Sequence, residues 1–238
     1  MMVTSQLSLP LSLRDEATFG NFLAPTGSVR AQVVDLLQNL ARGVDEGETS
    51  IYLWGGEGAG CSHLLQAACH EYQRQGRGVQ YLPLDELCDL EPDGLLADLE
   101  HQALVCLAHI EAVAGNHAWE LAIFNLFNRM RESGSLLLIG ADRPPRELPV
   151  TLPDLQSRLT WSLVFHLPFY GEMEKVAILR FRAARLGIEL GEEVAAFILN
   201  RGERSLATLM SYLARLDKAS LCARRRVTIP FVKAAFGW

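Results

Sequence analysis

The stretch from Ile51 to Leu65, I-Y-L-W-G-G-E-G-A-G-C-S-H-L-L, decides the fold of this chain. Its first four residues predict a buried strand, and the residues that follow its last glycine predict a helix. A glycine-rich turn between a strand and a helix is the setting of a phosphate-binding P-loop, in which backbone N–H groups and the helix N-terminus face a phosphate. Without that setting the glycines would indicate only a tight turn. We therefore expect a nucleotide-binding loop with Gly55, Gly58, Gly60, Cys61, Ser62 and His63 as its binding residues.

Cys61 stands where the pattern G-x-x-x-x-G-K-[ST] has its lysine. That lysine places a positive charge on the outer phosphates of a nucleotide. Its loss leaves the backbone cradle intact, so the sequence predicts weak nucleotide binding and a larger loss of hydrolysis. A thiol at a helix N-terminus is reactive in some proteins. The alternative interpretation is that a small side chain fills the space of the missing lysine.

The composition indicates a globular protein. The chain has 238 residues, of which 49% are hydrophobic, enough for one large or two modest domains. No apolar run is long enough to span a membrane, and no signal sequence is visible. Five cysteines without a C-x-x-C pair predict free thiols in a reducing cytoplasm and no metal site. A net charge of −6 disfavours a general nucleic-acid-binding surface, although the run 224–226 is either a phosphate contact or a solvated helix end.

Apolar runs alternate with helical patterns through the first two thirds of the chain. Strands are predicted at 51–54, 79–83, 103–108, 136–139 and 163–167. This alternation predicts an α/β fold with a mainly parallel five-stranded sheet covered on both faces. The last third predicts three helices, at 172–186, 192–201 and 205–223. We expect a tail at 1–13, an α/β nucleotide-binding-like domain over 14–168, and a small all-helical lid over 169–238.

The third predicted strand lacks the acidic residue with which the corresponding strand of a P-loop ATPase ends. In a P-loop ATPase this strand ends in a carboxylate that holds magnesium, often beside a second acid. Ala108 and His109 occupy those places, so the sequence predicts that the magnesium site is missing. Glu111 would share a face with His109 if the strand continued. The pair is then either an acid–base or metal-binding pair or a structural one.

Several motifs together mark a family resemblance. The P-loop, the five predicted strands and the helical lid resemble the AAA+ ATPases, and D-R-P-P at 142–145 with S-R-L-T-W at 157–161 resembles the ATPase region of the bacterial replication initiator DnaA. The chain reaches only Trp238, which leaves no room for that initiator's DNA-binding domain and makes it similar to the family's short regulatory members. The resemblance implies a negative regulator of DNA replication that stimulates hydrolysis of DnaA-bound ATP, with ADP as its own nucleotide.

The resemblance also assigns roles to two arginines. Arg158 matches the arginine finger, which is supplied in trans and stabilises the charge on the transferring phosphoryl group. Arg204 matches the lid arginine that touches a bound nucleotide. The protein would then be an activator of a partner ATPase and not itself an enzyme.

The N-terminal segment Q-L-S-L-P-L, residues 6–11, has leucines that predict either a partner or an edge strand on the chain's own body. The segment resembles the peptide by which bacterial proteins dock on the sliding clamp of DNA replication. That resemblance implies the clamp as a partner and DNA contact mainly through the clamp, and it leaves self-association open. The matching residues are Gln6, Leu7, Leu9, Pro10 and Leu11.

Two other functions compete with this interpretation. One is an autonomous AAA+ NTPase, which Cys61 and Ala108 disfavour. The other is a clamp-tethered adaptor that recruits different partners and makes no use of Arg158.

Overall fold

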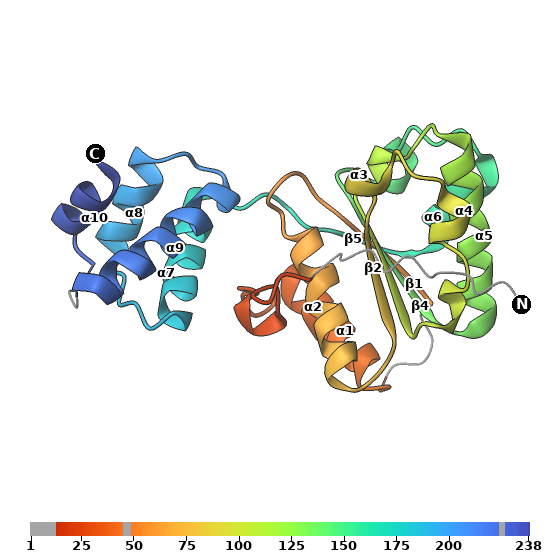
Figure 1. Ribbon diagram of the computed structural model, residues 1–238, viewed down its shortest axis with the longest axis horizontal. Helices are drawn as coiled ribbons and strands as arrows, with labels where there is room; N and C mark the ends of the chain where they lie inside the picture. The colour runs from red at the N-terminus through yellow and green to blue at the C-terminus, as the bar shows by residue number, and fades with distance from the viewer. Residues whose placement is uncertain (1–12, 45–48, 224–226) are drawn as a thin grey trace, which may run out of the picture.

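A parallel five-stranded sheet forms the centre of the α/β body in the computed structural model, which describes residues 13–44, 49–223 and 227–238 (Figure 1). The strand order is β2-β3-β4-β1-β5, and Ile51 of β1 pairs with Leu138 of β4 on one side and Leu163 of β5 on the other. The predicted α/β fold is confirmed. The strands are β1 (Ser50–Trp54), β2 (Val79–Pro83), β3 (Leu104–Ala108), β4 (Leu136–Ala141) and β5 (Leu163–His166).

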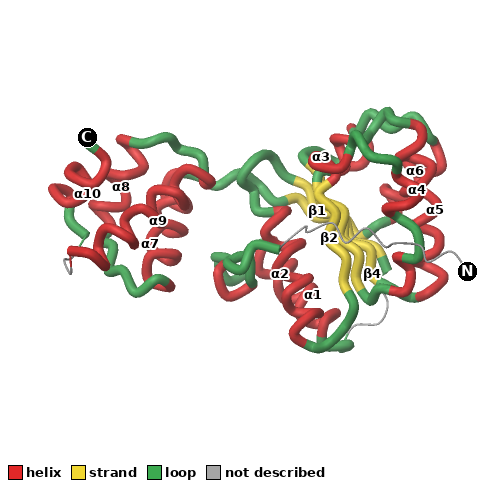
Figure 2. The backbone as a smooth tube through the Cα atoms, in the orientation of Figure 1, coloured by secondary structure: helices red, strands yellow, loops and turns green. Residues whose placement is uncertain are grey.

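Helices cover both faces of the sheet. α1 and α2 lie on one face, and α3, α4, α5 and α6 lie on the other, so that the strands form the middle layer in Figure 2. The first helix is capped by Ser28, whose hydroxyl accepts a hydrogen bond from the Ala31 N–H at 3.2 Å. The helices of the body are α1 (Val29–Ala41), α2 (Cys61–Arg74), α3 (Leu84–Leu87), α4 (Pro92–Leu95), α5 (His117–Ser133) and α6 (Pro153–Trp161). Short 3₁₀ turns are η1 (Phe19–Asn21), η2 (Leu99–His101), η3 (Ile110–Ala112) and η4 (Pro145–Glu147).

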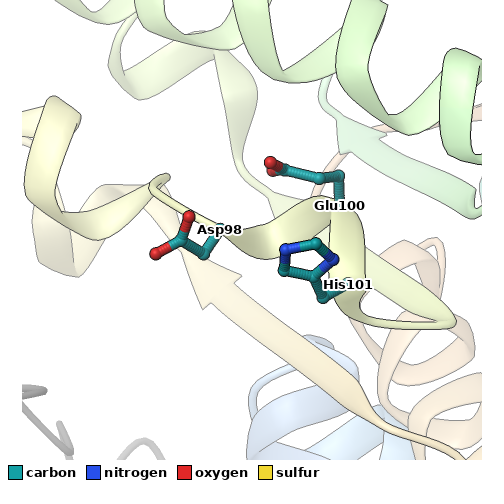
Figure 3. A group of neighbouring side chains, drawn as sticks. All are labelled: Asp98, Glu100 and His101. Carbon is teal, nitrogen blue, oxygen red and sulfur yellow. The ribbon is translucent and has the colours of Figure 1, made fainter.

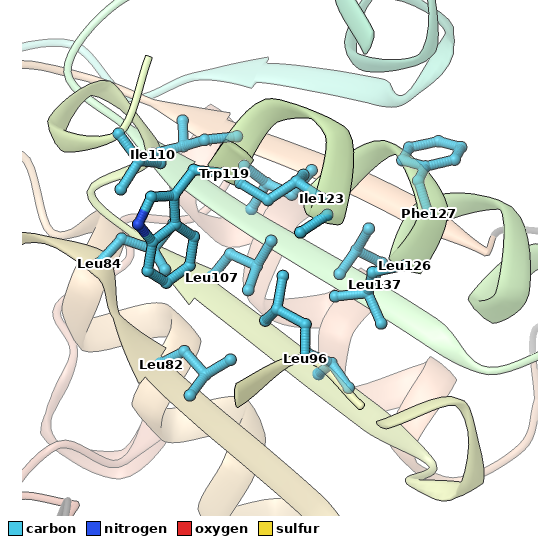
Figure 4. Close-up of a cluster of buried hydrophobic side chains, with 14 of the residues drawn as sticks. Leu82, Leu84, Leu96, Leu107, Ile110, Trp119, Ile123, Leu126, Phe127 and Leu137 are labelled. Atoms are coloured by element: carbon cyan, nitrogen blue, oxygen red, sulfur yellow. The ribbon is translucent and has the colours of Figure 1, made fainter. Parts of the chain in front are cut away.

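Alternating side chains of the strands fill two separate cores. In β1, Tyr52 joins the core under α5, whereas Ile51 and Leu53 join the core under α1 and α2. Trp119 of α5 is fully buried in the first of these cores, beside Leu107 of β3 (Figure 4). Each such buried side chain contributes about 1.5–3 kcal/mol to folding, so both faces fix the register of the sheet.

The lid has its own apolar core and one helix more than expected. Its helices are α7 (Glu172–Arg185), α8 (Glu192–Arg201), α9 (Leu206–Ala223) and α10 (Ile229–Phe236). The segment of α10 lies beyond the three predicted helices and contains Pro230. A proline in the first turn is compatible with a helix, and the Thr228 hydroxyl caps it by accepting from the Phe231 N–H at 3.4 Å. The Trp238 ring lies 5.5 Å from that of Tyr212 and closes this end of the lid.

Some predicted boundaries were wrong. Pro92 begins α4 and Gly94 lies inside it, in a segment for which no helix was predicted. The third strand ends at Ala108, because His109 has a left-handed backbone (φ 59°), so Glu111 does not continue the strand. The fourth strand continues beyond Ile139 to Ala141.

A buried arginine joins the body to the lid. Arg30 of α1 donates a hydrogen bond to the carbonyl of Pro168 in the linker, and its guanidinium carbon lies 3.6 Å from the centre of the Tyr170 ring. Its Nη1 also lies 3.9 Å from Glu174 of α7. The linker is therefore held by a cation from the first helix, a contact that the sequence analysis did not predict.

Two predictions lie outside the described residues: the tail at 6–11 and the arginine run at 224–226. Among the helices in the described ranges, none combines the length and apolarity needed to cross a bilayer.

Candidate functional site

A cavity of about 720 Å³ lies between the P-loop and the lid. The glycine-rich loop and the first turn of α2 line one side, and Met210 of α9 and Ile178 of α7 line the other. The segment before α1 closes a third side through Phe22, and the ends of β3 and β4 complete the cavity. The structure thus brings together all six residues that the sequence predicted for the nucleotide loop.

The P-loop keeps its backbone shape without the lysine. Gly58 and Gly60 have φ of 77° and 106°, values that favour glycine, and a side chain at Gly60 would collide with the Phe22 ring. The first hydrogen bond of α2 is donated by the Leu64 N–H to the Gly60 carbonyl. In the described chain the N–H groups of Ser62 and His63 have no acceptor, and they remain available to an anion or a developing negative charge, whereas the Cys61 N–H is directed at its own sulfur.

The Cys61 side chain behaves as a small packing residue. It packs against the core under α1 and α2, and burial raises the pKa of its thiol to about 12. A thiol with this pKa stays protonated near neutral pH, and the thiolate is the reactive form. The geometry therefore favours the space-filling interpretation of Cys61 over the reactive one.

His63 turns away from the phosphate position. Its Nε2 lies 2.9 Å from the Thr18 carbonyl, and its ring centre lies 5.3 Å from that of Phe22. Burial lowers the pKa of His63, so the ring is neutral near pH 7 and its Nε2–H donates a hydrogen bond to that carbonyl. Its side chain anchors the segment before α1, and only its backbone faces the loop.

His109 and Glu111 come together with Ser62 at the floor of the cavity. The Ser62 Oγ lies 3.1 Å from the His109 Nε2, and the His109 Nδ1 lies 3.2 Å from the Glu111 Oε1. The other Glu111 oxygen accepts from the Asp142 N–H at 3.2 Å. The sequence anticipated the His109–Glu111 pair but not Ser62, because the contact joins α2 to the end of β3 through tertiary structure.

Arg204 does not reach the cavity. Its guanidinium pairs with Glu172 at 2.6 Å on the surface of the lid, and its side chain is 58% exposed. The lid residues that line the cavity from α9 are Leu206, Ala207, Met210, Ser211 and Ala214. The expectation that Arg204 touches a nucleotide therefore has no support in this geometry, because the residue precedes α9 and faces α7.

Arg182 of α7 is a cavity residue that the sequence analysis missed. It donates to the Asn21 carbonyl at 3.1 Å and pairs with Glu16 at 2.8 Å. These bonds tie the lid to the segment before α1 and place a cation beside the loop. Only the tertiary fold brings together residues that lie more than 150 positions apart.

Arg158 lies on α6, away from the cavity. Its guanidinium carbon lies 4.9 Å from the centre of the Trp161 ring and 6.0 Å from that of Phe124. Within the described ranges it has no carboxylate partner. Trp161 is itself 66% exposed, so a charged and an aromatic side chain stand together on the surface.

One group of side chains in the described chain has the spacing for a metal ion. The ligand atoms of Asp98, Glu100 and His101 lie within 4.8 Å of one another on one short turn (Figure 3). Asp98 and His101 are exposed, and Glu100 already accepts a hydrogen bond from Arg129 at 2.9 Å. The positive charge of the Arg129 guanidinium therefore disfavours the binding of a metal ion at Glu100.

Comparisons with known proteins agree with this architecture. Residues 13–166 match the bacterial DnaA ATPase domain, and residues 172–236 match the Hda lid domain. Domain III of the Thermotoga maritima replication initiation protein DnaA has a TM-score of 0.75 and 22% identity, over 94% of this chain and 97% of that chain. AMPPCP-bound DnaA from Aquifex aeolicus has a TM-score of 0.72 and 20% identity, over 87% of this chain and 67% of that one. The Thermotoga maritima RuvB branch migration motor has a TM-score of 0.66 and 16% identity, over 93% of this chain and 71% of that one.

At these identities the solved structures establish the fold alone, and that fold with its P-loop cleft defines a module of the AAA+ class. The DnaA ATPase match covers more than half of the chain. The chain therefore belongs to the DnaA family, and its lid is of the Hda type.

Proposed function

We propose that this protein is a negative regulator of DNA replication initiation that stimulates hydrolysis of DnaA-bound ATP through Arg158. The family match and the Hda-type lid support a DnaA-related regulator. The observation that carries the finer proposal is the position of Arg158, outside the chain's own cavity and without an acidic partner in the described residues. A guanidinium held by two aromatic rings keeps its N–H donors free for a phosphoryl group on another molecule.

The chain's own cleft supports a role as activator and not as an ATPase. The lysine is replaced by Cys61, and the acidic position at the end of β3 is occupied by Ala108 and His109. The free P-loop amides still suit a phosphate, so we propose that ADP binds here weakly and without a metal ion. The rival function, an autonomous NTPase, would need catalytic groups that replace both the missing P-loop lysine and the missing acidic residue at the end of β3.

The sliding clamp is the second proposed partner. The segment at 6–11 supplies the resemblance, and DNA would be contacted mainly through the clamp. An adaptor that recruits other proteins would use the same tail. The two functions differ in that only the activator of DnaA-bound ATP hydrolysis requires Arg158.

Hydrolysis of ATP bound to DnaA tests the proposal. We expect the full-length protein with clamp-loaded DNA to stimulate ADP formation, and Arg158→Ala to reduce that stimulation by about a hundredfold or to the basal rate. Arg158→Lys should restore only part of it, because an ammonium lacks the planar fork of a guanidinium.

The matched control is Arg131→Ala, which removes an exposed arginine at the end of α5. It should stimulate as the wild type does, and both variants should keep their clamp affinity and circular dichroism. Full stimulation by Arg158→Ala would refute the trans-acting role, and ATP turnover by this protein alone would favour the autonomous NTPase.

A further inference from the structure

Ser62, His109 and Glu111 form a hydrogen-bonded chain that the proposed regulatory function does not use. The Ser62 Oγ to His109 Nε2 distance is 3.1 Å, and the His109 Nδ1 to Glu111 Oε1 distance is 3.2 Å. This is the order of a hydroxyl nucleophile, an imidazole base and a carboxylate that orients the base. The Asp142 N–H holds the second Glu111 oxygen at 3.2 Å, so the carboxylate is itself fixed.

The backbone explains how these three side chains meet. Ser62 lies in the first turn of the 14-residue helix α2, directly after a strand and a tight turn. His109 follows β3, which is separated from β1 by β4 in the sheet, and its left-handed conformation (φ 59°) ends that strand and allows the chain to turn into η3. Glu111 lies in η3, two residues later. The hydrogen bond to Glu111 raises the pKa of His109, which favours an imidazole that accepts a proton.

Donors for a developing oxyanion lie beside the hydroxyl. The N–H groups of Ser62 and His63 have no acceptor within the described ranges, and the dipole of α2 points the same way. The cavity of about 720 Å³ in front of them has apolar walls from Phe22, Ile178 and Met210. It therefore has space for a small acyl group next to the hydroxyl.

We propose that Ser62, His109 and Glu111 form an ester-cleaving centre for short-chain carboxylic esters. The Ser62 oxygen forms a bond to the ester carbonyl carbon, and its proton moves to the His109 Nε2. The alcohol leaves with that proton as the C–O bond breaks, and an acyl group stays on Ser62. Water then attacks the acyl carbon, gives a proton through His109 back to Ser62, and releases a carboxylic acid. Glu111 orients the imidazole and is a positioning residue.

Covalent labelling of the full-length protein tests this centre directly. The probe is a biotin-linked fluorophosphonate: the Ser62 oxygen forms a bond to phosphorus, the P–F bond breaks, and the hydroxyl proton leaves through His109. We expect one label per chain, located on Ser62 by peptide mass spectrometry. The neighbouring Cys61 thiol does not compete, because burial holds its pKa at about 12.

Hydrolysis of p-nitrophenyl acetate supplies the second measurement. Ser62→Ala and His109→Gln should each lower kcat/KM by about a hundredfold or more and abolish labelling. Glu111→Gln should lower kcat and leave KM within about twofold, because orientation of the base matters mainly in the transition state.

Two matched variants control for the chemistry. Ser133→Ala removes an exposed serine of α5, and His117→Gln removes an exposed histidine of the same helix. Both should label and turn over as the wild type does, with unchanged thermal unfolding. A wild-type protein that carries no label on Ser62, or that hydrolyses the ester no faster than Ser62→Ala, would overturn the proposal. Neither result depends on Arg158. The ester-cleaving centre and the proposed regulatory function are therefore tested independently of each other.

Discussion

At the scale of single residues, position 61 shows that the backbone conformation of the P-loop does not depend on its lysine. The loop conformation comes from Gly58 and Gly60 and from the contact of Gly60 with Phe22, whereas Cys61 packs inward. Phosphate attraction therefore rests on N–H dipoles without the ammonium charge. An active P-loop combines this backbone shape with the positive charge of a lysine, whereas this chain has the backbone shape without that charge.

Nucleotide affinity should reflect this separation. We expect ATP and ADP to bind with dissociation constants above about 1 μM, and magnesium to change them little, because neither the lysine nor the magnesium-holding acid is present. Isothermal titration calorimetry with Mg²⁺ and with EDTA measures both affinities. Sub-micromolar ATP binding that requires magnesium would contradict the argument from Cys61 and Ala108.

At the scale of elements, one buried carboxylate fixes the start of α6, the helix that carries Arg158. Glu120 of α5 is only 1% exposed. It accepts from the N–H groups of Gly115 at 2.7 Å, Thr151 at 2.9 Å and Leu152 at 2.8 Å, and from the Thr151 hydroxyl at 2.6 Å. Burial alone would raise the pKa of Glu120, but these hydrogen bonds outweigh it and lower the pKa below the usual carboxyl value.

Replacing this carboxylate should destabilise the protein. Glu120→Gln brings an amide NH₂ against backbone donors, and we expect the free energy of unfolding to fall by about 1–3 kcal/mol in urea titrations at pH 7. The folded pKa is lowered, so the contribution of Glu120 is complete above about pH 4.5 and is lost as the pH falls through the folded pKa. The difference between variant and wild type should shrink over that acid range. Glu132→Gln, an exposed change on the same helix, is the control and should have no effect.

Local sequence patterns predicted most of the strands and helices, but they could not predict the contacts between side chains of different elements. The strand runs depend on neighbouring residues, so the sequence was enough to place β1 and the other strands. The bond between Ser62 and His109, and the bond between Glu120 and Thr151, join residues 47 and 31 positions apart in the chain. Arg204 is matched to the cleft by a motif, whereas in the structure its guanidinium pairs with Glu172 on the surface of the lid and does not line the cavity.

At the scale of the whole molecule, the body and the lid are linked by arginines. Arg30 holds the linker at Pro168, and Arg182 of the lid bonds to Asn21 before α1. Asn21 and Arg182 line the cavity, as does Tyr170, the ring against which Arg30 packs, so the position of the lid and the shape of the cleft depend on each other. Arg158 and Trp161 lie outside this joint, on the surface of α6.

Docking on the clamp should depend on the tail and not on the folded units. We expect Leu9→Ala with Leu11→Ala to abolish binding to the clamp in surface plasmon resonance, because burial of two leucines is worth roughly 3–6 kcal/mol before ordering costs. The control is Ser8→Ala, which changes a residue between the motif positions. Unchanged affinity of the double variant would reject the clamp-binding segment.

The glycine loop also affects how proteins of this kind are found in genomes. Gly58 and Gly60 have a positive φ although Cys61 and not a lysine follows them, so the glycine spacing is a more robust mark of this loop than the lysine. A survey that requires lysine at position seven of the signature would pass over this chain. A survey that scores the glycine spacing between a strand and a helix would retrieve it, together with other members whose charged residues have been lost.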